Sequence, residues 1–340
     1  MKTIGKSVIN LLKALVLPGV LYLILILLIP ERIANWQSFT IIINMSIIPS
    51  IIACGMSFGW ICGIIDFSIG SCIIFASLVG AAAGNLFGIP GLFLGAIAAA
   101  LLIEAIISGV FRLLRIPSLV ITLGMLMIFE IAGNRFAALV GRLWPEMSTG
   151  YYIRLNQNIT FLGTPLWMLI VLLITLSIYT LVFYRTKMAN QARVVGSDEL
   201  IAKNVGIQPM QVKFKAWLAG GFFLGIAAAL TAAYSGSATP QTNMTTLSAV
   251  FRPMMCVVIA LSLQSLVPVP VGIFIGAFSM NIIFTGIIAL GISDNMQNVM
   301  LGIFLIIVVA SPKVANDIKL IRRRKTAQKL FLQEDTNYGL

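Results

Sequence analysis

Residues 269–290 have the sequence VPVGIFIGAFSMNIIFTGIIAL, which contains no charged side chain. About 20 predominantly apolar residues in a helix are enough to cross the hydrocarbon core of a bilayer. The rest of the chain has the same character, because 59% of its 340 residues are hydrophobic and only 10% are charged. Soluble domains carry about 25% charged residues. We therefore expect a lipid bilayer to cover much of this protein's surface.

Similar apolar runs recur along the chain and predict an all-α polytopic membrane protein with about ten transmembrane helices. The predicted spans are residues 15–30, 38–62, 68–88, 90–111, 116–133, 165–184, 214–234, 250–267, 269–290 and 295–311. The first run follows Lys2, Lys6 and Lys13, as in a secretory signal peptide, but it lacks a small-x-small cleavage site. We therefore expect an uncleaved first helix.

The distribution of Lys and Arg predicts the orientation, since cytoplasmic loops of membrane proteins are enriched in these residues. Ten spans put both termini on the same side. If that side is the cytoplasm, only five of the 23 basic residues lie outside, namely Arg32, Arg135, Arg142, Arg154 and Arg252. The net charge of +12 then reflects topology and requires no nucleic acid. The basic run at 322–325 is expected to contact lipid headgroups.

Two longer hydrophilic stretches interrupt the spans. The outer one, at about 134–164, contains Trp144 and Tyr151, whose amphipathic rings suit a membrane interface. The inner one, at about 186–212, predicts a short amphipathic helix with Ser197 as N-cap and Gly206 at its end. A structured cytoplasmic loop is expected to dock a partner. We expect one transmembrane domain at 1–312 and a basic cytoplasmic tail at 313–340.

The chain carries few side chains suited to catalysis. It has no His, and its four Cys residues form no CxxC pair, so no metal site is expected. The GKS tripeptide at residues 5–7 lacks the preceding glycine of a phosphate-binding loop. We therefore expect that this chain is not an enzyme and does not itself hydrolyse ATP.

Three acidic residues near membrane depth are candidates for function, because burying a charge in a bilayer is costly. Asp66 lies at a predicted cytoplasmic turn, where it could cap a helix, and Glu130 lies within reach of Asn134 near the outer face. Glu104 is the deepest, but it lacks a matched basic or acidic partner. A proton relay through these acids is therefore an alternative and not the leading hypothesis.

Residues 55–71, GMSFGWICGIIDFSIGS, interrupt an apolar region with glycines and polar groups, which predicts a broken helix beside a transport pathway. This segment resembles the GM-x-F-V-I-x-x-G-G-I-D-L-S-V-G-S signature of the ribose, xylose and arabinose-type permeases of bacterial ATP-binding-cassette importers. Residues 115–125, RIPSLVITLGM, resemble that family's K-I-P-P-F-I-V-T-L-G-T segment. Residues 196–207, GSDELIAKNVGI, resemble its G-x-N-E-x-A-A-R-L-S-G-I cytoplasmic loop, and SGSATP at 235–240 keeps the family's order.

The resemblance implies a permease with the type II importer fold in the bacterial inner membrane. It implies three protein partners: an ATP-binding subunit that uses ATP and Mg²⁺, a second permease subunit, and an extracytoplasmic solute-binding protein. This chain itself is expected to bind no cofactor. The implied solute is small and polar, with a monosaccharide as the first candidate.

The resemblance also assigns candidate site residues. Coupling to the ATP-binding subunit is expected from the segment 193–207, at Arg193, Gly196, Asp198, Glu199, Ala202, Lys203 and Gly206. The pathway candidates are Gly55, Trp60, Gly63, Asp66, Ser68, Gly70, Ser71, Pro117, Thr122, Gly124 and Asn134. No catalytic and no metal-binding residue is assigned.

One segment departs from the family pattern. Residues 260–271, ALSLQSLVPVPV, stand where the family has the glycine-rich stretch G-G-x-S-x-x-G-G-x-G-S-V, and only Gly272 and Gly276 follow. Leu, Val and Pro stiffen the backbone and prevent its close approach. This departure predicts that the chain is one of two unlike permease subunits.

Other functions remain open from the sequence. A related permease could carry nucleosides or another small polar metabolite, since side chains such as Trp60, Asn134, Asn281 and Asn295 suit many ligands. An ion-coupled secondary transporter and a non-transporting scaffold or receptor are the alternatives from other classes.

Overall fold

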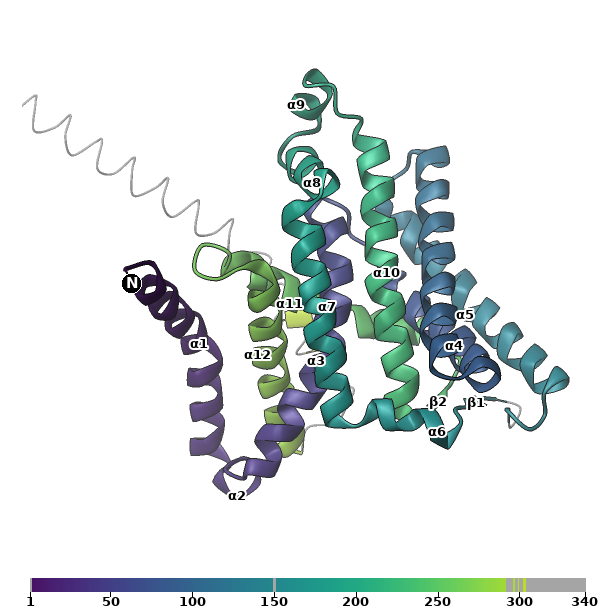
Figure 1. Ribbon diagram of the computed structural model, residues 1–340, viewed down its shortest axis with the longest axis horizontal. Coiled ribbons are helices and arrows are strands. Elements are labelled where there is room, and N and C mark those ends of the chain that lie inside the picture. Colours follow the sequence, from purple (N-terminus) through teal and green to yellow (C-terminus); the bar gives the residue numbers. More distant parts are fainter. Residues whose placement is uncertain (1, 149–150, 292–295, 297–298, 300–301, 304–340) are drawn as a thin grey trace, which may run out of the picture. The chain divides into compact units, whose positions relative to one another are not determined.

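Helices make up most of the computed structural model, which describes residues 2–148, 151–291, 296, 299 and 302–303. The long helices are α1 (Lys2–Leu28), α3 (Trp36–Ile61), α4 (Ile69–Leu114), α5 (Ser118–Leu143), α7 (Pro165–Arg185), α10 (Pro209–Ser235), α11 (Ser248–Ser262) and α12 (Val269–Ala289). The short elements are α2 (Pro30–Ile33), β1 (Ile153–Arg154), α6 (Gln157–Thr160), η1 (Phe161–Gly163), α8 (Lys187–Ser197), α9 (Glu199–Asn204), β2 (Ser237–Ala238) and η2 (Thr245–Leu247). Figure 1 shows their arrangement.

Eight helices among the described residues are long and apolar enough to cross a membrane. This confirms the prediction of an all-α polytopic membrane protein. The tenth predicted span at 295–311, apart from four positions, and the tail at 313–340 lie outside the described residues. The predicted domain boundary and the cytoplasmic location of the termini stay predictions.

Helix α4 contains two of the predicted spans. Its 46 residues bend at Gly88, which has the non-helical dihedral angles φ 70° and ψ −154°. A side chain strongly disfavours such angles, whereas glycine tolerates them. We call residues 69–87 the first arm and 90–114 the second arm. The arms fold back on each other, since a Cβ at Gly80 would lie 2.9 Å from the Cβ of Ala96.

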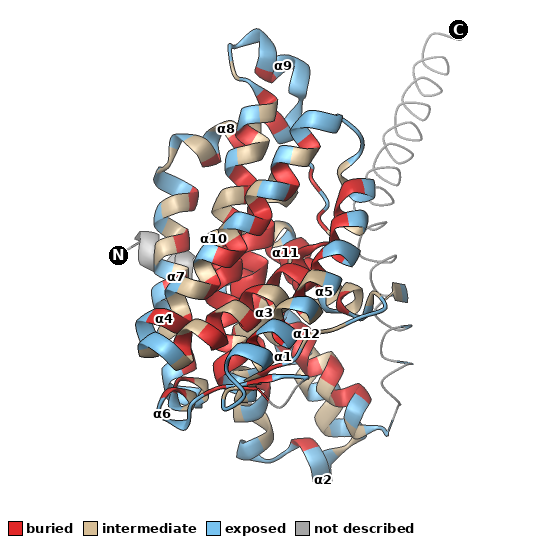
Figure 2. Ribbon diagram, turned by 90° about the vertical axis from the view of Figure 1, so that its right-hand side faces the viewer, coloured by how far each residue is buried: buried red, intermediate tan, exposed pale blue. Residues whose placement is uncertain are grey.

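Helix α10 lies among the other helices and packs against α4 and α3. Figure 2 shows the concentration of buried residues along it. Gly55 of α3 and Gly220 of α10 allow this packing, because a Cβ at either one would lie within 2.9 Å of the other's carbonyl oxygen. Small residues let helix backbones approach in this way in membranes. The glycines and alanines of α10 therefore serve helix packing.

Helices α11 and α12 form a second packed pair, joined by residues 263–268. A Cβ at Gly276 would lie 2.8 Å from the Cys256 carbonyl oxygen, and one at Gly272 would lie 3.1 Å from the Ala260 Cα. The two glycines retained beside the departing segment are thus the ones at the helix crossing. Pro270 lies in the first turn of α12, where its missing N–H has no helical partner to lose.

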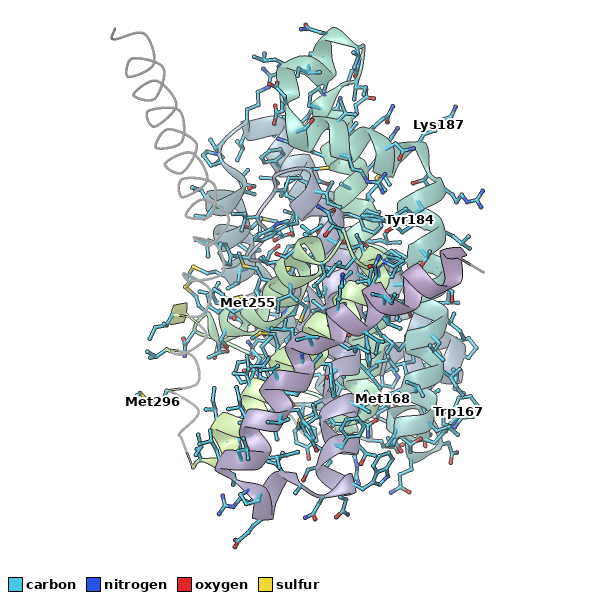
Figure 3. The ribbon with its side chains drawn as sticks, turned by 90° about the vertical axis from the view of Figure 1, so that its left-hand side faces the viewer. Trp167, Met168, Tyr184, Lys187, Met255 and Met296 are labelled. Atoms are coloured by element: carbon cyan, nitrogen blue, oxygen red, sulfur yellow. The ribbon has the colours of Figure 1, made fainter. Side chains whose placement is uncertain are left out.

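The two ends of the helices carry different small elements (Figure 1). The segment formed by α8 and α9 lies at one end. At the other end lie α2, α6 and the antiparallel pair β1 and β2, in which Ile153 pairs with Ala238. Figure 3 shows Trp167 and Tyr184 near opposite ends of α7. Amphipathic aromatic side chains favour both membrane interfaces, so α7 has the aromatic pattern of a spanning helix.

Three predicted boundaries are wrong. Helix α5 continues to Leu143, so the first ten residues of the predicted loop 134–164 are helical. The span predicted at 250–267 is η2 with α11 and covers Thr245–Ser262, so it begins and ends five residues earlier than predicted. Helix α10 begins at Pro209 and not at 214. Polar residues inside α5 and α10 hid the true ends of these helices, whereas apolar residues of the turn after α11 extended the predicted span too far.

Candidate functional site

The helix break predicted within residues 55–71 is present between α3 and α4. Helix α3 ends at Ile61, Gly63 follows with a left-handed φ of 73°, and α4 begins at Ile69. Residues 62–68 therefore form a non-helical segment, which we call the first break. Non-helical backbone at membrane depth occurs where protein buries it or where it lines a cavity.

Asp66 organises the first break. Its side chain is 6% exposed, and it accepts hydrogen bonds from the backbone N–H of Ser68 at 2.8 Å and from the Ser68 hydroxyl. Its second oxygen accepts the indole N–H of Trp217 at 2.8 Å. The bond to the Ser68 N–H closes a turn just before α4 and is not the helix cap suggested for Asp66, because Ser68 is itself the N-cap of α4 and no side chain caps this helix. The bond to Trp217 ties the break to α10, and the sequence analysis did not predict it.

A second break lies between α10 and α11, and the sequence analysis missed it. After β2, residues 239–247 run without a long helix, and Asn243 and Met244 adopt left-handed φ values of 60° and 59°. Such angles are uncommon for residues other than glycine. The Thr-rich sequence at 239–247, with Pro240 and Asn243, was the available signal of an irregular segment.

Helix α5 holds the second break through Glu130. The Glu130 carboxylate accepts the backbone N–H of Met244 at 2.8 Å, the backbone N–H of Thr246 at 3.1 Å and the Thr246 hydroxyl at 2.7 Å. The Asn134 amide donates to the carbonyl of Gln241 at 3.0 Å. A carboxylate that accepts N–H groups near the start of a helix acts as a cap. Glu130 therefore caps the region where η2 and α11 begin.

The start of α4, directly after the first break, is in contact with the second break. A Cβ at Gly70 would lie 2.1 Å from the carbonyl oxygen of Thr246, so glycine is required at this meeting point. The same helix α5 also reaches the first break, because the hydroxyl of Thr122 accepts the backbone N–H of Phe67 at 3.2 Å. Together, the two breaks and the α5 side chains that bind them form our candidate site.

The predicted pathway residues fall into two groups. Those at the breaks, on α5 beside them or at the α3–α10 crossing are Gly55, Asp66, Ser68, Gly70, Ser71, Thr122 and Asn134. Gly63 also lies in the first break, at an exposed position. The structure does not bring Trp60, Pro117 and Gly124 into this group, because Trp60 is only half-buried and the other two are exposed. Their assignment to the pathway stays a prediction.

The predicted coupling helix is in fact two helices, α8 and α9. Ser197 is the last residue of α8, and its hydroxyl donates to the carbonyl of Val194. Asp198 is the N-cap of α9 instead, since its carboxylate accepts the N–H of Leu200 at 2.7 Å. Asp198 rather than Ser197 has the extended backbone that a cap requires. Gly206 follows α9 with a φ of 79°, as expected for a helix end.

The segment of α8 and α9 is attached to the ends of the spanning helices. A Cβ at Gly196 would lie 1.6 Å from the carbonyl oxygen of Ile61, where α3 ends and the first break begins. The Arg193 guanidinium donates to the Phe183 carbonyl at 2.8 Å and lies 4.7 Å from that residue's ring centroid. Glu199 of α9 forms an ion pair with Lys213 of α10.

The outer side of α9 is apolar and exposed. Leu200, Ile201 and Val205 are 69%, 55% and 63% exposed. Ala202 is fully buried against the rest of the chain, while Lys203 is exposed. Grouped exposed apolar side chains mark interaction surfaces, so α9 presents a surface suited to a partner protein.

Within the described part of the chain, no group of three or more His, Cys, Asp or Glu side chains is placed to hold a metal ion. All four Cys residues are free thiols and buried. The polar groups of the candidate site are instead carboxylates, hydroxyls and backbone amides, which form hydrogen bonds to uncharged polar molecules.

Comparison with known proteins identifies the family. Residues 38–309 match the family described as the permease component of branched-chain amino acid transport systems. Searches of curated proteins and of solved structures gave no match. The match includes both breaks, α8 and α9, and it covers well over half of the chain. The chain therefore belongs to this permease family, whose members are the transmembrane components of ATP-binding-cassette transporters.

Proposed function

We propose that this chain is the permease subunit of an ATP-driven importer in the bacterial inner membrane, with a monosaccharide as its solute. The resemblance of residues 55–71, 115–125 and 196–207 to ribose, xylose and arabinose-type permeases supports a sugar. The matched family is described by branched-chain amino acid transport, so leucine belongs among the solutes to be tested.

The contact between Gly196 and Ile61 is the observation that carries the proposal. It connects the segment of α8 and α9 directly to the beginning of the first break. A partner that binds the apolar side of α9 and moves it displaces the end of α3 as well. Rigid elements pressed together transmit movement in this way. This arrangement supports coupling through Arg193, Gly196, Asp198, Glu199, Ala202, Lys203 and Gly206.

The proximity of the two breaks supports a polar solute. Backbone groups outside regular helices are free to form hydrogen bonds with a ligand, and transporters use interrupted helices for this purpose. Asp66, Glu130 and Thr246 orient these segments through hydrogen bonds. Sugar hydroxyls both donate and accept hydrogen bonds, so they suit such a surface better than an aliphatic side chain does.

The end of the molecule opposite α8 and α9, where β1 and β2 lie, supports contact with an external solute-binding protein. A groove of about 460 Å³ is lined there by Asn85, Glu146, Arg154 and Asn156. Asn85 stabilises its wall by donating to the Arg154 carbonyl and accepting the N–H of Asn156. The proposed assembly also contains a second permease subunit, which the departing segment at 260–271 suggests is a different chain.

Reconstitution in liposomes tests the proposal. This chain is purified together with the ATP-binding and solute-binding proteins encoded beside it, and with the second permease subunit if one is encoded there. Uptake of labelled pentoses, hexoses, nucleosides and leucine is then measured. We expect sugar uptake that requires internal ATP and stops when the Walker lysine of the ATP-binding subunit is replaced. Uptake that persists without that subunit and collapses with an uncoupler would support an ion-coupled carrier instead.

A binding assay identifies the solute independently. A ligand that binds only the folded solute-binding protein raises its apparent melting temperature. We expect a monosaccharide to give the largest shift among the same compounds. A larger shift with a nucleoside or with leucine would leave the permease function intact and replace the proposed solute.

A further inference from the structure

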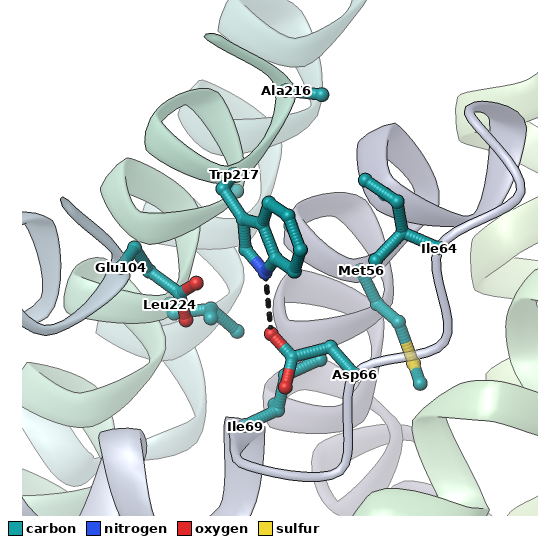
Figure 4. Close-up of a pocket in the computed structure, with 11 residues that line it drawn as sticks. Met56, Ile64, Asp66, Ile69, Glu104, Ala216, Trp217 and Leu224 are labelled. Carbon is teal, nitrogen blue, oxygen red and sulfur yellow. Dashed lines mark hydrogen bonds between the residues drawn. The ribbon is translucent and has the colours of Figure 1, made fainter. Parts of the chain in front are cut away.

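A small cavity lies beside the first break, between α3, α4 and α10. It has a volume of about 20 Å³ and is lined by residues that include Gly55, Asp66, Glu104, Trp217 and Leu224. Figure 4 shows the side chains of Glu104, Asp66 and Trp217 around it. A buried water molecule needs a cavity of at least about 10–15 Å³. The cavity therefore has room for one water molecule.

Glu104 is the unexplained group in this cavity. It is 1% exposed, and neither of its carboxyl oxygens accepts a hydrogen bond from any described residue. Gly221 on α10 makes room for it, because a Cβ there would lie 2.9 Å from the Glu104 Cγ. An ionised carboxylate that is buried without a partner is very costly. Glu104 therefore needs a proton, a cation or a hydrogen-bond donor that the described side chains do not supply.

The groups that face Glu104 come from each neighbouring element. Asp66 lines the same cavity from the first break, and the Cys72 thiol lies near Glu104 on the first arm of α4 without forming a hydrogen bond of normal geometry to it. On α10 the indole N–H of Trp217 is already donated to Asp66. The charged residue Lys213 of α10 is paired with Glu199 and does not line the cavity. No basic side chain among the described residues lines this cavity.

We propose that this cavity is a buried proton and water site, in which Glu104 is in its carboxylic acid form and one water links it to the Asp66 carboxylate. A carboxylic acid supplies one O–H donor. The water accepts this hydrogen bond and donates to Asp66, whose oxygens keep their bonds to Ser68 and Trp217. Two negative charges around one small cavity are thereby avoided. The site connects the second arm of α4, the first break and α10.

The proton has a structural role in this arrangement. It remains on Glu104 during transport, which distinguishes the site from the relay of an ion-coupled carrier. Glu104→Gln keeps the shape of the side chain and its ability to donate a hydrogen bond, so we expect uptake within about twofold of the wild type. The inference does not depend on which solute is transported.

Infrared spectroscopy of the purified full chain tests the proposal, because only a protonated carboxyl group shows the carboxylic acid C=O stretch. At neutral pH we expect this band in the wild type, its loss in E104Q and its displacement in E104D. Asp66→Asn and Glu130→Gln are matched controls, since hydrogen-bond donors already surround both carboxylates. The band should persist in both controls.

Three results would overturn the proposal. The first is a wild-type spectrum without the band, and the second is a band that remains in E104Q. The third is a sodium-dependent rise in the melting temperature of the wild type that E104Q lacks, which would identify a cation site. If E104Q does not fold, the wild type, D66N and E130Q still decide: a band present in all three supports the proposal, and a band lost in either control refutes it.

Discussion

Gly196→Ala tests the contact between the coupling segment and the spanning helices. The new Cβ would lie 1.6 Å from the Ile61 carbonyl oxygen and 2.8 Å from its carbonyl carbon. Both are backbone atoms, which cannot rotate aside. The Cβ must retreat by about 1.8 Å to reach an ordinary contact distance of 3.4 Å. Overpacking of this kind costs about 1–3 kcal/mol, which corresponds to a roughly 5- to 150-fold shift away from the docked arrangement.

The neighbouring Cys62 provides the assay. It is 2% exposed, and its Cα lies 3.5 Å from the Cβ position of Gly196. In a chain whose other three cysteines are replaced, the rate of Cys62 labelling by a thiol reagent reports displacement of α8. We expect faster labelling in G196A and less solute transported per ATP hydrolysed. Gly109→Ala, at an exposed position in the second arm of α4, is the control, because nothing lies within 4 Å of its Cβ position.

Unchanged labelling and transport in G196A, in protein that is otherwise well folded, would refute the contact and with it the proposed route of coupling. Equal effects of G196A and G109A would also refute it, since they would show a general sensitivity to alanine. Alanine in place of an exposed helical glycine is itself expected to be neutral or to stabilise by about 0.5–1 kcal/mol.

Three further substitutions test the candidate site. Trp217→Phe removes the N–H that Asp66 accepts and should destabilise the fold by about 1–3 kcal/mol, seen as a lower melting temperature with a thiol-reactive dye; an unchanged melting temperature would exclude a stabilising role for this bond. Glu130→Ala leaves two backbone N–H groups of the second break unpaired, again at about 1–3 kcal/mol each, and should accelerate proteolysis within 239–247; cleavage at the wild-type rate would contradict the cap. Asp198→Ala removes the N-cap of α9, at about 0.5–2 kcal/mol, and should speed hydrogen exchange of the amides that it caps; equal exchange rates would show that the cap is not formed.

The sequence predicts the class of fold and one of the two breaks. Apolar runs of sufficient length identify the spans, since a bilayer requires them. The boundary predicted between the spans 68–88 and 90–111 coincides with the bend of α4 at Gly88, although both spans belong to this one helix. The first break is predictable because its glycines and Asp66 interrupt an apolar region within a few residues.

The partners of these residues are not predictable in the same way. Trp217 lies 151 positions from Asp66, and Thr246 lies 116 positions from Glu130. Neither separation along the chain produces a periodic pattern in the sequence, because both contacts arise from the packing of separate helices. Local errors have a different origin. Ser197 and Asp198 are both good N-caps, and only the backbone shows which of them leaves the helix.

Helix α5 binds both breaks, through Thr122 at the first and Glu130 at the second. Two segments that rearranged independently would have four combined states. Segments attached to one rigid helix have two, because displacing that helix alters both sets of hydrogen bonds together. The shared attachment to α5 thus makes the two breaks change together in any movement that displaces this helix.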